Sequence, residues 1–421
     1  MTARAATADD NGKRRKTTNM AVTETTTESW GSRLGGAFKG VIAGLALFAA
    51  GFPVLFWNEG NSVKTAKALD EGEGACVAVE SAAKVDPANE GRLVHMSAKA
   101  ETKDVLSDDD FGVSVTALAL TRTVEMYQWE EECEEKKQKN AGGSVTTTRT
   151  YTYRKVWRER AIDSSGFKEE GHENPAALEF ESKETRAANV TFGAFRLGEQ
   201  QVARIGAGQP YAFPESFTSR VARVQMKGPT LYVPNRTTRE NALNNRDVAS
   251  MPRIGDMRVT FTVIYPHEIS LVAKQRGDTF VGYKAKTGKT VDLLQDGVAD
   301  AATMFQDARD ANALLTWLLR LGGLLLMYFG LSMVLRPISV LADVLPFLGD
   351  LAEMGIGLVA GLVSLVCALV TIAVAWLFYR PVLGVALLAA AGFFLWKLLQ
   401  RRRKAKAAKA AAAAAANGAA A

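Results

Sequence analysis

The residues best suited to acid–base chemistry lie in the sequence Gly-His-Glu-Asn-Pro, at residues 171–175. His172 beside Glu173 could transfer protons, because imidazole and carboxylate side chains are common general acids and bases. The alternative is a tight turn before a helix, with Asn174 as its cap and Pro175 at its first position. We favour the turn, so neither side chain is predicted to be catalytic.

Other chemistry finds little support in the sequence. The remaining histidines, His95 and His267, are isolated, and the chain contains neither Cys-x-x-Cys nor His-x-x-x-His. It also lacks a Gly-x-Ser-x-Gly nucleophile motif and a phosphate-binding loop. We therefore predict no catalytic residue, no metal site, no cofactor and no enzymatic activity.

The elements that would position any functional residue are strongly apolar. Val41 to Trp57 carries no charge, 313–335 carries only Arg320, and 355–396 carries only Arg380. About 20 apolar residues suffice to cross a bilayer as a helix. Pro381 interrupts the last stretch, because proline removes a helical hydrogen bond. The sequence thus predicts four transmembrane helices, at residues 39–57, 313–335, 355–379 and 381–399.

The distribution of charge predicts which side of the membrane each part occupies. The net charge is +6, but the tails 1–40 and 397–421 carry +3 and +7, and residues 58–312 carry −4. A mildly acidic middle region argues against nucleic-acid binding. Lys and Arg flanking membrane helices stay on the cytoplasmic side. We therefore expect a basic disordered tail at 1–38 and a basic Ala-rich tail at 400–421, both cytoplasmic, with 58–312 outside the cytoplasm.

Several residues are predicted to anchor the helices at the membrane surface. Arg320 lies about two turns inside its helix, and we expect its long side chain to reach the nearby interface. Aromatic and basic residues at helix ends prefer the same region. The predicted anchors are Phe56, Trp57, Trp317, Arg320, Tyr379 and Arg380.

The segment 336–354, expected on the cytoplasmic side, is amphipathic with an acidic polar face of Asp343, Asp350 and Glu353. Helices that lie on lipid usually carry Lys and Arg there, so we expect this segment to dock partly on protein or to re-enter the bilayer edge. Gly357 and Gly361, four residues apart, are predicted to let another helix approach within the bundle.

Residues 58–312 predict a β-rich domain, because most of its segments are rich in Val, Thr, Tyr and Ile. A charged hairpin should turn at 140–143, and helices are expected at 174–188 and 298–312. A loose internal similarity suggests two related β-units, at about 73–165 and 215–297. Cys76 and Cys133 could pair on an oxidising side, although free thiols are slightly favoured.

The sequence Asn58-Glu59-Gly60 follows the first apolar stretch. It is predicted to form the exit from the bilayer, with Asn61 capping a short helix that ends near Gly72. We interpret this region as the coupling between membrane and outer domain, without assigning chemistry to it.

These pieces together carry a family resemblance. The sequence resembles the LUMA family, also called transmembrane protein 43, in "NEGNSVKTAKALDEG", "VEMYQW", "GHENPAAL", "GDMRVTF", "VAKQRGD" and "WLFYRP", in the family's order from residue 58 to 381. The resemblance implies four membrane helices, a large lumenal or periplasmic domain and no established enzymatic activity. In animals it implies the endoplasmic reticulum and inner nuclear membrane, with lamina and emerin-type partners. The Ala-rich, Arg-rich composition here suggests a bacterium, so those partners do not carry over.

The fold class predicted is a multi-pass α-helical membrane protein with a β-rich α+β domain inserted between the first two helices. The favoured function is a non-enzymatic membrane scaffold with the lipid bilayer, and either copies of itself or other membrane proteins, as partners. The alternatives are a subunit of an ion channel or transport assembly and, ranked lower, a membrane-anchored hydrolase. The expected location is a bacterial inner membrane with the domain in the periplasm, or the endoplasmic reticulum or inner nuclear membrane in a eukaryote.

Overall fold

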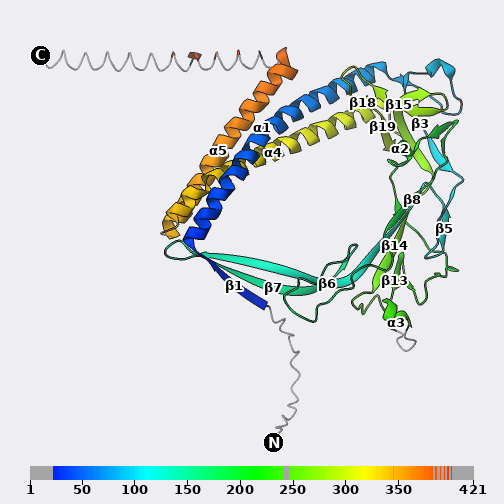
Figure 1. Ribbon diagram of the computed structural model, residues 1–421. Coiled ribbons are helices and arrows are strands. Elements are labelled where there is room, and N and C mark those ends of the chain that lie inside the picture. Colours follow the sequence, from blue (N-terminus) through cyan, green and yellow to red (C-terminus); the bar gives the residue numbers. More distant parts are fainter. Residues whose placement is uncertain are drawn as a thin grey trace, which may run out of the picture.

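Three long helices form one half of the molecule and a β-rich domain forms the other (Figure 1). The computed structural model describes residues 22–240, 246–344 and 346–382, with a few single positions between 385 and 400. The helices are α1 (Trp30–Ala75), α4 (Ala301–Ala342) and α5 (Pro346–Tyr379). Within the described residues, these three are long and apolar enough to cross a membrane. The predicted fourth helix, 381–399, falls mostly outside the described residues.

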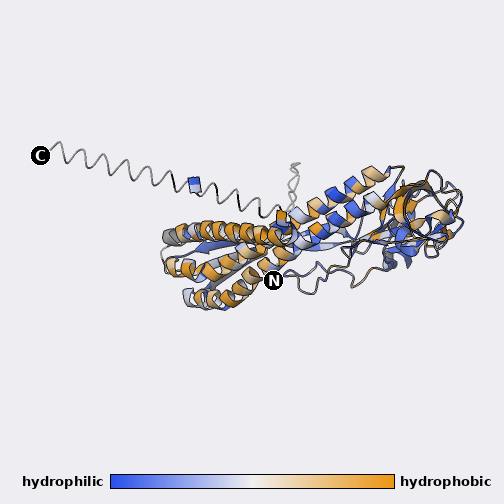
Figure 2. Ribbon diagram, turned by 90° about the horizontal axis from the view of Figure 1, so that it is seen from above, coloured by the Kyte–Doolittle hydropathy of each residue, from blue (hydrophilic) through white to orange (hydrophobic). Residues whose placement is uncertain are grey.

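The long helices are apolar at one end and polar at the other. Figure 2 shows hydrophobic residues concentrated along the bundle, while the parts of α1 and α4 nearest the β-rich domain are more hydrophilic. Both helices run on into that domain without interruption. The predicted break after Trp57, with a new helix capped by Asn61, is therefore wrong, because α1 continues to Ala75. The second apolar helix likewise begins at Ala301 rather than 313, as the helical pattern at 298–312 had indicated.

One sheet of eight strands contains the long hairpin. Its order is β1-β7-β6-β14-β13-β12, with β8 beside β6 and β11 beside β14, and all pairs are antiparallel. The strands are β1 (Val22–Glu28), β6 (Ala119–Lys139), β7 (Val145–Arg158), β8 (Lys183–Arg186), β11 (Gln209–Pro210), β12 (Gln225–Lys227), β13 (Thr230–Val233) and β14 (Met257–Ile264). The predicted turn at 140–143 is confirmed.

A second sheet of seven strands has the order β10-β9-β3-β15-β16, with β19 beside β15 and β2 beside β3. Its strands are β2 (Val77–Ala78), β3 (Leu93–Thr102), β9 (Val190–Phe192), β10 (Phe195–Leu197), β15 (His267–Arg276), β16 (Thr279–Val281) and β19 (Leu293–Asp296). Two small pairs complete the domain: β4 (Val105–Asp108) with β5 (Val113–Thr116), and β17 (Tyr283–Lys284) with β18 (Thr290–Val291). The remaining described helices are short: a 3-10 turn at Pro87–Asn89, α2 (Glu199–Val202) and α3 (Arg236–Glu240).

The main apolar core is shared by the two sheets. Buried side chains of β14, including Phe261, pack with buried side chains of β3 and β15, including Met96 and Leu271. Alternate residues of β14 face this core, as expected for a strand with one buried face. A second core, which includes Leu69 of α1 and Phe305 of α4, joins the helices to the seven-stranded sheet.

Three sequence expectations need correction here. Residues 22–38 of the predicted disordered tail form β1 and the start of α1, while residues 1–21 lie outside the described part. No helix forms at 174–188, where the chain turns and then enters β8. The two proposed β-units are not separate, because β3 of the first pairs with β15 of the second and β6 pairs with β14.

Candidate functional site

A buried ion pair joins the three long helices, and we call it the charged junction: Glu59 of α1, Arg320 of α4 and Trp376 of α5. The Arg320 Nε and Nη2 atoms donate to the two carboxylate oxygens of Glu59, at 2.6 Å and 2.9 Å. The indole Nε1 of Trp376 donates to the same carboxylate at 2.7 Å. Because one carboxylate accepts three N–H groups from two other helices, it ties the helices together at one point.

The surroundings of the junction compensate for burying its charges. The Glu59 side chain is 3% exposed and that of Arg320 is 17% exposed. The guanidinium carbon lies 4.6 Å from the ring centre of Trp317 and 5.9 Å from that of Trp376. A buried charge is tolerated when it is paired and fully hydrogen-bonded, and aromatic faces add cation–π attraction. Arg320 therefore differs from the expected free, snorkelling residue, because its charge is held by Glu59.

The residues next to Glu59 in the sequence also contact α4 and α5. The Asn58 side-chain amide donates to the carbonyl of Thr316 in α4 at 3.0 Å, and the hydroxyls of Thr316 and Ser62 hydrogen-bond at 2.8 Å. Gly60 faces α5 instead, where a Cβ atom would lie 2.5 Å from the ring of Tyr379. Asn58, Glu59 and Gly60 are all buried. They were predicted to couple membrane and domain, and the structure brings all three to this junction.

A second charged cluster lies at the opposite end of the bundle, and we call it the clasp. Here Nζ of Lys139, at the end of β6, lies 3.1 Å from Asp343, 2.9 Å from Asp350 and 2.8 Å from Glu353. Arg33 of α1 also pairs with Asp343. Partial burial opposes the charge of Lys139, but the three carboxylates outweigh it and raise the pKa of its ammonium group. The predicted acidic face thus docks on protein, which was one of the two arrangements expected for this segment.

Backbone contacts complete the clasp. The indole of Trp30 donates to the carbonyl of Val340 at 2.8 Å, and the Gly142 N–H donates to the carbonyl of Val344 at 3.1 Å. Gly143 has a φ of 80°, and a Cβ atom there would lie 2.4 Å from the Trp30 ring. Only glycine fits this turn without strain or clash.

The clasp also corrects the predicted topology. The hairpin was placed on the opposite side of the membrane from residues 1–38 and 336–354. In the structure β1 (Val22–Glu28) pairs with β7 along its whole length, and the hairpin tip contacts Asp343 and Glu353. These three parts of the chain therefore meet at one end of the bundle.

The other predicted anchors occupy two kinds of position. Trp57 and Trp317 are 61% and 66% exposed on the outer surface of the bundle, where lipid would reach them. Phe56 instead packs against α5, with ring centres 5.6 Å from Phe378 and 5.4 Å from Tyr379. Arg380 continues the end of α5 through a backbone bond from its N–H to the Trp376 carbonyl.

His172 and Glu173 are held by separate local contacts. The imidazole of His172 stacks on Tyr153, with ring centres 4.0 Å apart, and meets the edge of Trp129 at 4.4 Å. Glu173 accepts the Gly171 N–H at 2.9 Å, and this bond lowers the pKa of its carboxyl group. Asn174 caps no helix, because its amide bonds to the backbone N–H and carbonyl of Trp129. These contacts describe a folded turn against β6 and β7.

Helix packing depends on glycines that the sequence analysis overlooked. A Cβ atom on Gly330 would lie 2.4 Å from the backbone nitrogen of Phe48, and one on Gly44 would lie 2.7 Å from the Gly330 carbonyl. Gly51 and Gly323 make the next such contact, seven residues along each helix. That equal spacing in α1 and α4 was the available signal for a close crossing. The predicted Gly357 and Gly361 have a looser contact with Tyr328 of α4, within the bundle as expected.

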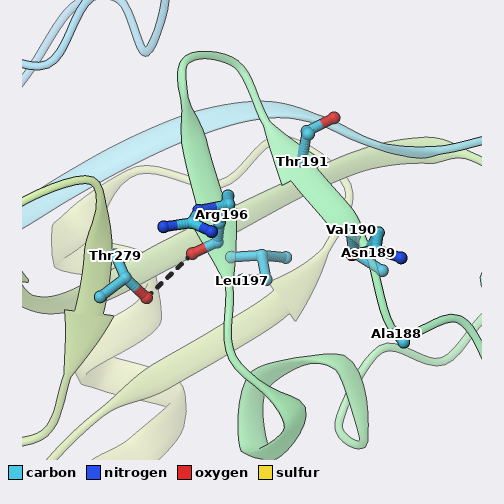
Figure 3. Close-up of a pocket in the computed structure, with 7 residues that line it drawn as sticks. All are labelled: Ala188, Asn189, Val190, Thr191, Arg196, Leu197 and Thr279. Carbon is cyan, nitrogen blue, oxygen red and sulfur yellow. Dashed lines mark hydrogen bonds between the residues drawn. The ribbon is translucent and has the colours of Figure 1, made fainter.

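One surface cavity lies at the seven-stranded sheet, away from both charged clusters. Its volume is about 290 Å³, and it is lined by residues of β9, β10 and β16 and by the two residues before β9, among them Asn189, Arg196 and Thr279 (Figure 3). Arg196 is exposed and pairs with Asp278, while its carbonyl accepts the Thr279 hydroxyl at 3.0 Å. The described residues contain no group of three His, Cys, Asp or Glu side chains arranged to hold a metal ion. Cys76, Cys133 and Cys367 are free thiols.

Comparison with known proteins identifies relatives that all carry the same description. A family model described as "Transmembrane protein 43" matches residues 126–381. Transmembrane protein 43 of Rattus norvegicus and that of Homo sapiens are each 34% identical over 360 residues, which is 83% of this chain and 86% of each relative. A homologue from Drosophila melanogaster is 32% identical over 357 residues, or 82% and 90% of the two chains. No solved structure matches.

Proposed function

The chain belongs to the transmembrane protein 43 family of membrane proteins, and from this premise we propose that it is a non-enzymatic integral membrane scaffold. In this proposal the β-rich domain organises partner proteins or further copies of the chain. The helices hold that domain in a fixed position relative to the bilayer.

The observation that carries the proposal is the charged junction of Glu59, Arg320 and Trp376. It lies where the apolar parts of α1 and α4 end and their polar extensions into the domain begin. A movement of one helix would separate a buried carboxylate from its partners, which is costly. The junction therefore favours a rigid connection, as a scaffold requires.

Further contacts fix the domain to the helical extensions. The turn between β17 and β18 packs along α1, where the Tyr283 hydroxyl donates to Glu71 at 3.1 Å and the Thr287 hydroxyl donates to the Lys64 carbonyl at 3.1 Å. Arg309 of α4 pairs with Asp70 and Glu73 of α1. The β17–β18 region is thus bonded to α1, and α1 is paired with α4, which supports a rigid connection rather than free rotation of the domain.

A channel or transport subunit is the second candidate, and Arg320 was its main support. Because the guanidinium is bonded to Glu59 and packed against two tryptophans, it is not a free cation available to a permeating ion. The hydrolase alternative rested on His172 and Glu173, which bond to separate backbone groups. Neither observation now favours its candidate function over the scaffold.

The location and sidedness stay predictions. The relatives named above are animal proteins, which fits the eukaryotic alternative, namely the endoplasmic reticulum or inner nuclear membrane. A bacterial inner membrane with a periplasmic domain is the other alternative. Reporter fusions at residue 72 and within 346–354 would determine the side of each segment.

The proposal is tested by comparing wild type with Arg320→Leu in lipid bilayers. A scaffold predicts no ionic conductance from either protein, together with reduced resistance to unfolding in the variant. The exposed pair Lys136–Glu134 supplies the control, since Lys136→Leu should change neither property. A wild-type conductance that Arg320→Leu abolishes would instead establish the channel.

A further inference from the structure

One face of α1 changes from apolar to basic where the uncharged stretch of the helix ends. Trp57 closes that stretch and is 61% exposed. Asn61 and Lys64 follow on the same face of the continuous helix, roughly 6 Å and 10 Å farther along its axis. Each headgroup layer of a bilayer is roughly 5–8 Å thick. This face of α1 therefore passes through the headgroup layer just beyond Trp57.

The turn between β17 and β18 adds a further lysine to the same face. The Thr287 hydroxyl of this turn donates to the Lys64 carbonyl at 3.1 Å, and the Lys289 ammonium group donates to the side-chain oxygen of Asn61. Figure 1 shows β18 beside the end of α1 that enters the domain. The ammonium group of Lys289 thus lies at the level of Asn61, although it belongs to the β-rich domain.

The two segments that meet here carry positive charge and no negative charge. Residues 60–69 of α1 and residues 283–291 of the β17–β18 unit contain no acid. We call their five lysines the lysine surface: Lys64, Lys67, Lys284, Lys286 and Lys289. In the part of the chain that the structure describes, none of the five forms an ion pair. Because like charges repel, a bound anion would stabilise this surface.

The acids nearest to the lysine surface along α1 are already engaged. Glu59 belongs to the charged junction, where its carboxylate is paired. Asp70 and Glu73 pair with a guanidinium group of α4, and Glu71 accepts a hydroxyl and a backbone N–H from the β17–β18 unit. A counter-ion for the lysine surface must therefore come from outside these segments.

We propose that the lysine surface binds the headgroup phosphate of an anionic phospholipid, held between Lys64 and Lys289 with its acyl chains beside Trp57. A lipid is the fitting anion, because the apolar stretch of α1 ends next to these lysines and a lipid presents its charge at that boundary. Basic residues beside a membrane helix attract anionic lipid, and an indole prefers the same interface. The bound lipid joins the β17–β18 turn to the bilayer. This inference goes beyond the scaffold proposal, since it holds whichever protein the domain binds.

Lysine labelling of the wild-type chain tests the site without a substitution. The full chain is placed in nanodiscs of phosphatidylcholine, alone or mixed with phosphatidylglycerol, and is treated briefly with a water-soluble amine reagent. Peptide mass spectrometry then reports the modification of each lysine. Phosphatidylglycerol should slow the labelling of Lys64 and Lys289 about fivefold, and it should not affect Lys183, which is exposed on β8.

Substitution tests whether these two lysines select the lipid. Spin-labelled phosphatidylglycerol and phosphatidylcholine report the preference of the chain for the anionic lipid through the fraction of each that is immobilised. Lys64→Gln combined with Lys289→Gln should lower this preference at least about fivefold, whereas the arginine pair at the same positions should keep it. Lys183→Gln combined with Lys227→Gln removes two exposed lysines of the eight-stranded sheet and should leave the preference unchanged.

The outcomes separate a lipid site from its alternatives. Labelling of Lys64 and Lys289 that is equal in both lipids, or slowed equally at Lys183, would overturn the site, as would an unchanged preference in the glutamine pair. Protection of Lys64 and Lys289 by inorganic phosphate in phosphatidylcholine nanodiscs, at constant ionic strength, would show a site for free phosphate and overturn the lipid assignment. Loss of the preference in the glutamine pair, restored by the arginine pair, supports the site. None of these results changes the scaffold proposal, which Arg320→Leu tests separately.

Discussion

Removal of Arg320 should expose how much the charged junction contributes to stability. The Glu59 carboxylate is 3% exposed in the wild-type structure. In Arg320→Leu it loses two hydrogen bonds and the one countercharge that the described residues supply, and it keeps the bond from Trp376. Breaking a buried ion pair by removing one partner costs about 3–5 kcal/mol. Glu59→Gln should cost less, about 2 kcal/mol, because the amide keeps the shape and the guanidinium can turn outward.

The measurement is denaturant unfolding in mild-detergent micelles, with the free energy of unfolding taken from the midpoint and slope. The double variant Glu59→Leu with Arg320→Leu supplies the matched control, since it leaves no buried charge behind. It should be about 2–3 kcal/mol more stable than Arg320→Leu alone, because no buried charge is left unpaired. If Arg320→Leu unfolds within about 0.5 kcal/mol of the wild type, the junction is not a buried pair and the reasoning fails.

Three other substitutions or reactions test separate contacts. Lys139→Gln should open the clasp and speed hydrogen exchange at the hairpin tip about tenfold, whereas Lys136→Gln should have no effect; equal exchange rates would refute the clasp. Gly330→Ala should destabilise the bundle by about 1–3 kcal/mol, because its Cβ atom would lie 2.4 Å from the backbone of α1. Gly322→Ala is the control and should be neutral or stabilising, because its Cβ atom would meet open space. Thermal melts that rank the two variants otherwise would contradict this packing. Burial, aided by the nearby negative charge of Glu73, raises the pKa of the Cys76 thiol to about 11. Alkylation of Cys76 at pH 8 should therefore be about a hundredfold slower than in the denatured chain, and it should accelerate with pH up to about 11. Equal alkylation rates in the folded and denatured chains would exclude the shift.

The sequence was sufficient for features determined by local pattern. Apolar length predicted the three helices described here, and alternation with Val and Thr predicted the β-rich domain. Asn140 to Gly143 predicted the hairpin turn, since two glycines with positive φ were needed there. These features depend on residues that are close in the chain.

Contacts between distant residues could not be read in the same way. Arg320 lies 261 positions from Glu59, and neither residue alone indicates the other as its partner. Lys139 was one charge among many in a solvated hairpin, and nothing nearby in the sequence marked it as the residue that meets Asp343. The expected helix after Pro175 failed for a similar reason, because Asn174 bonds to Trp129 on another strand.

The position of the hairpin shows where an argument from local charge is insufficient. The predicted topology placed residues 1–38 and 336–354 on the same side, and the start of α1 does meet the acidic segment at Asp343. Charge bias gave no information about the hairpin, whose tip reaches the same end of the bundle through tertiary contacts. The clasp is the consequence, since the hairpin tip meets Asp343 and Glu353 there.

The most direct test of the central claim is the distance between the hairpin tip and the start of α5 in a lipid bilayer. Spin labels at Ala141 and Leu351, in chains whose native cysteines are replaced, would be measured by pulsed electron resonance in nanodiscs diluted with unlabelled protein. If the clasp holds the hairpin tip against α5, the distance distribution should be single, short and narrow, and Lys139→Gln should broaden it. A long or broad distribution in the wild-type background would contradict the clasp. It would also contradict the rigid connection between helices and domain on which the scaffold proposal depends.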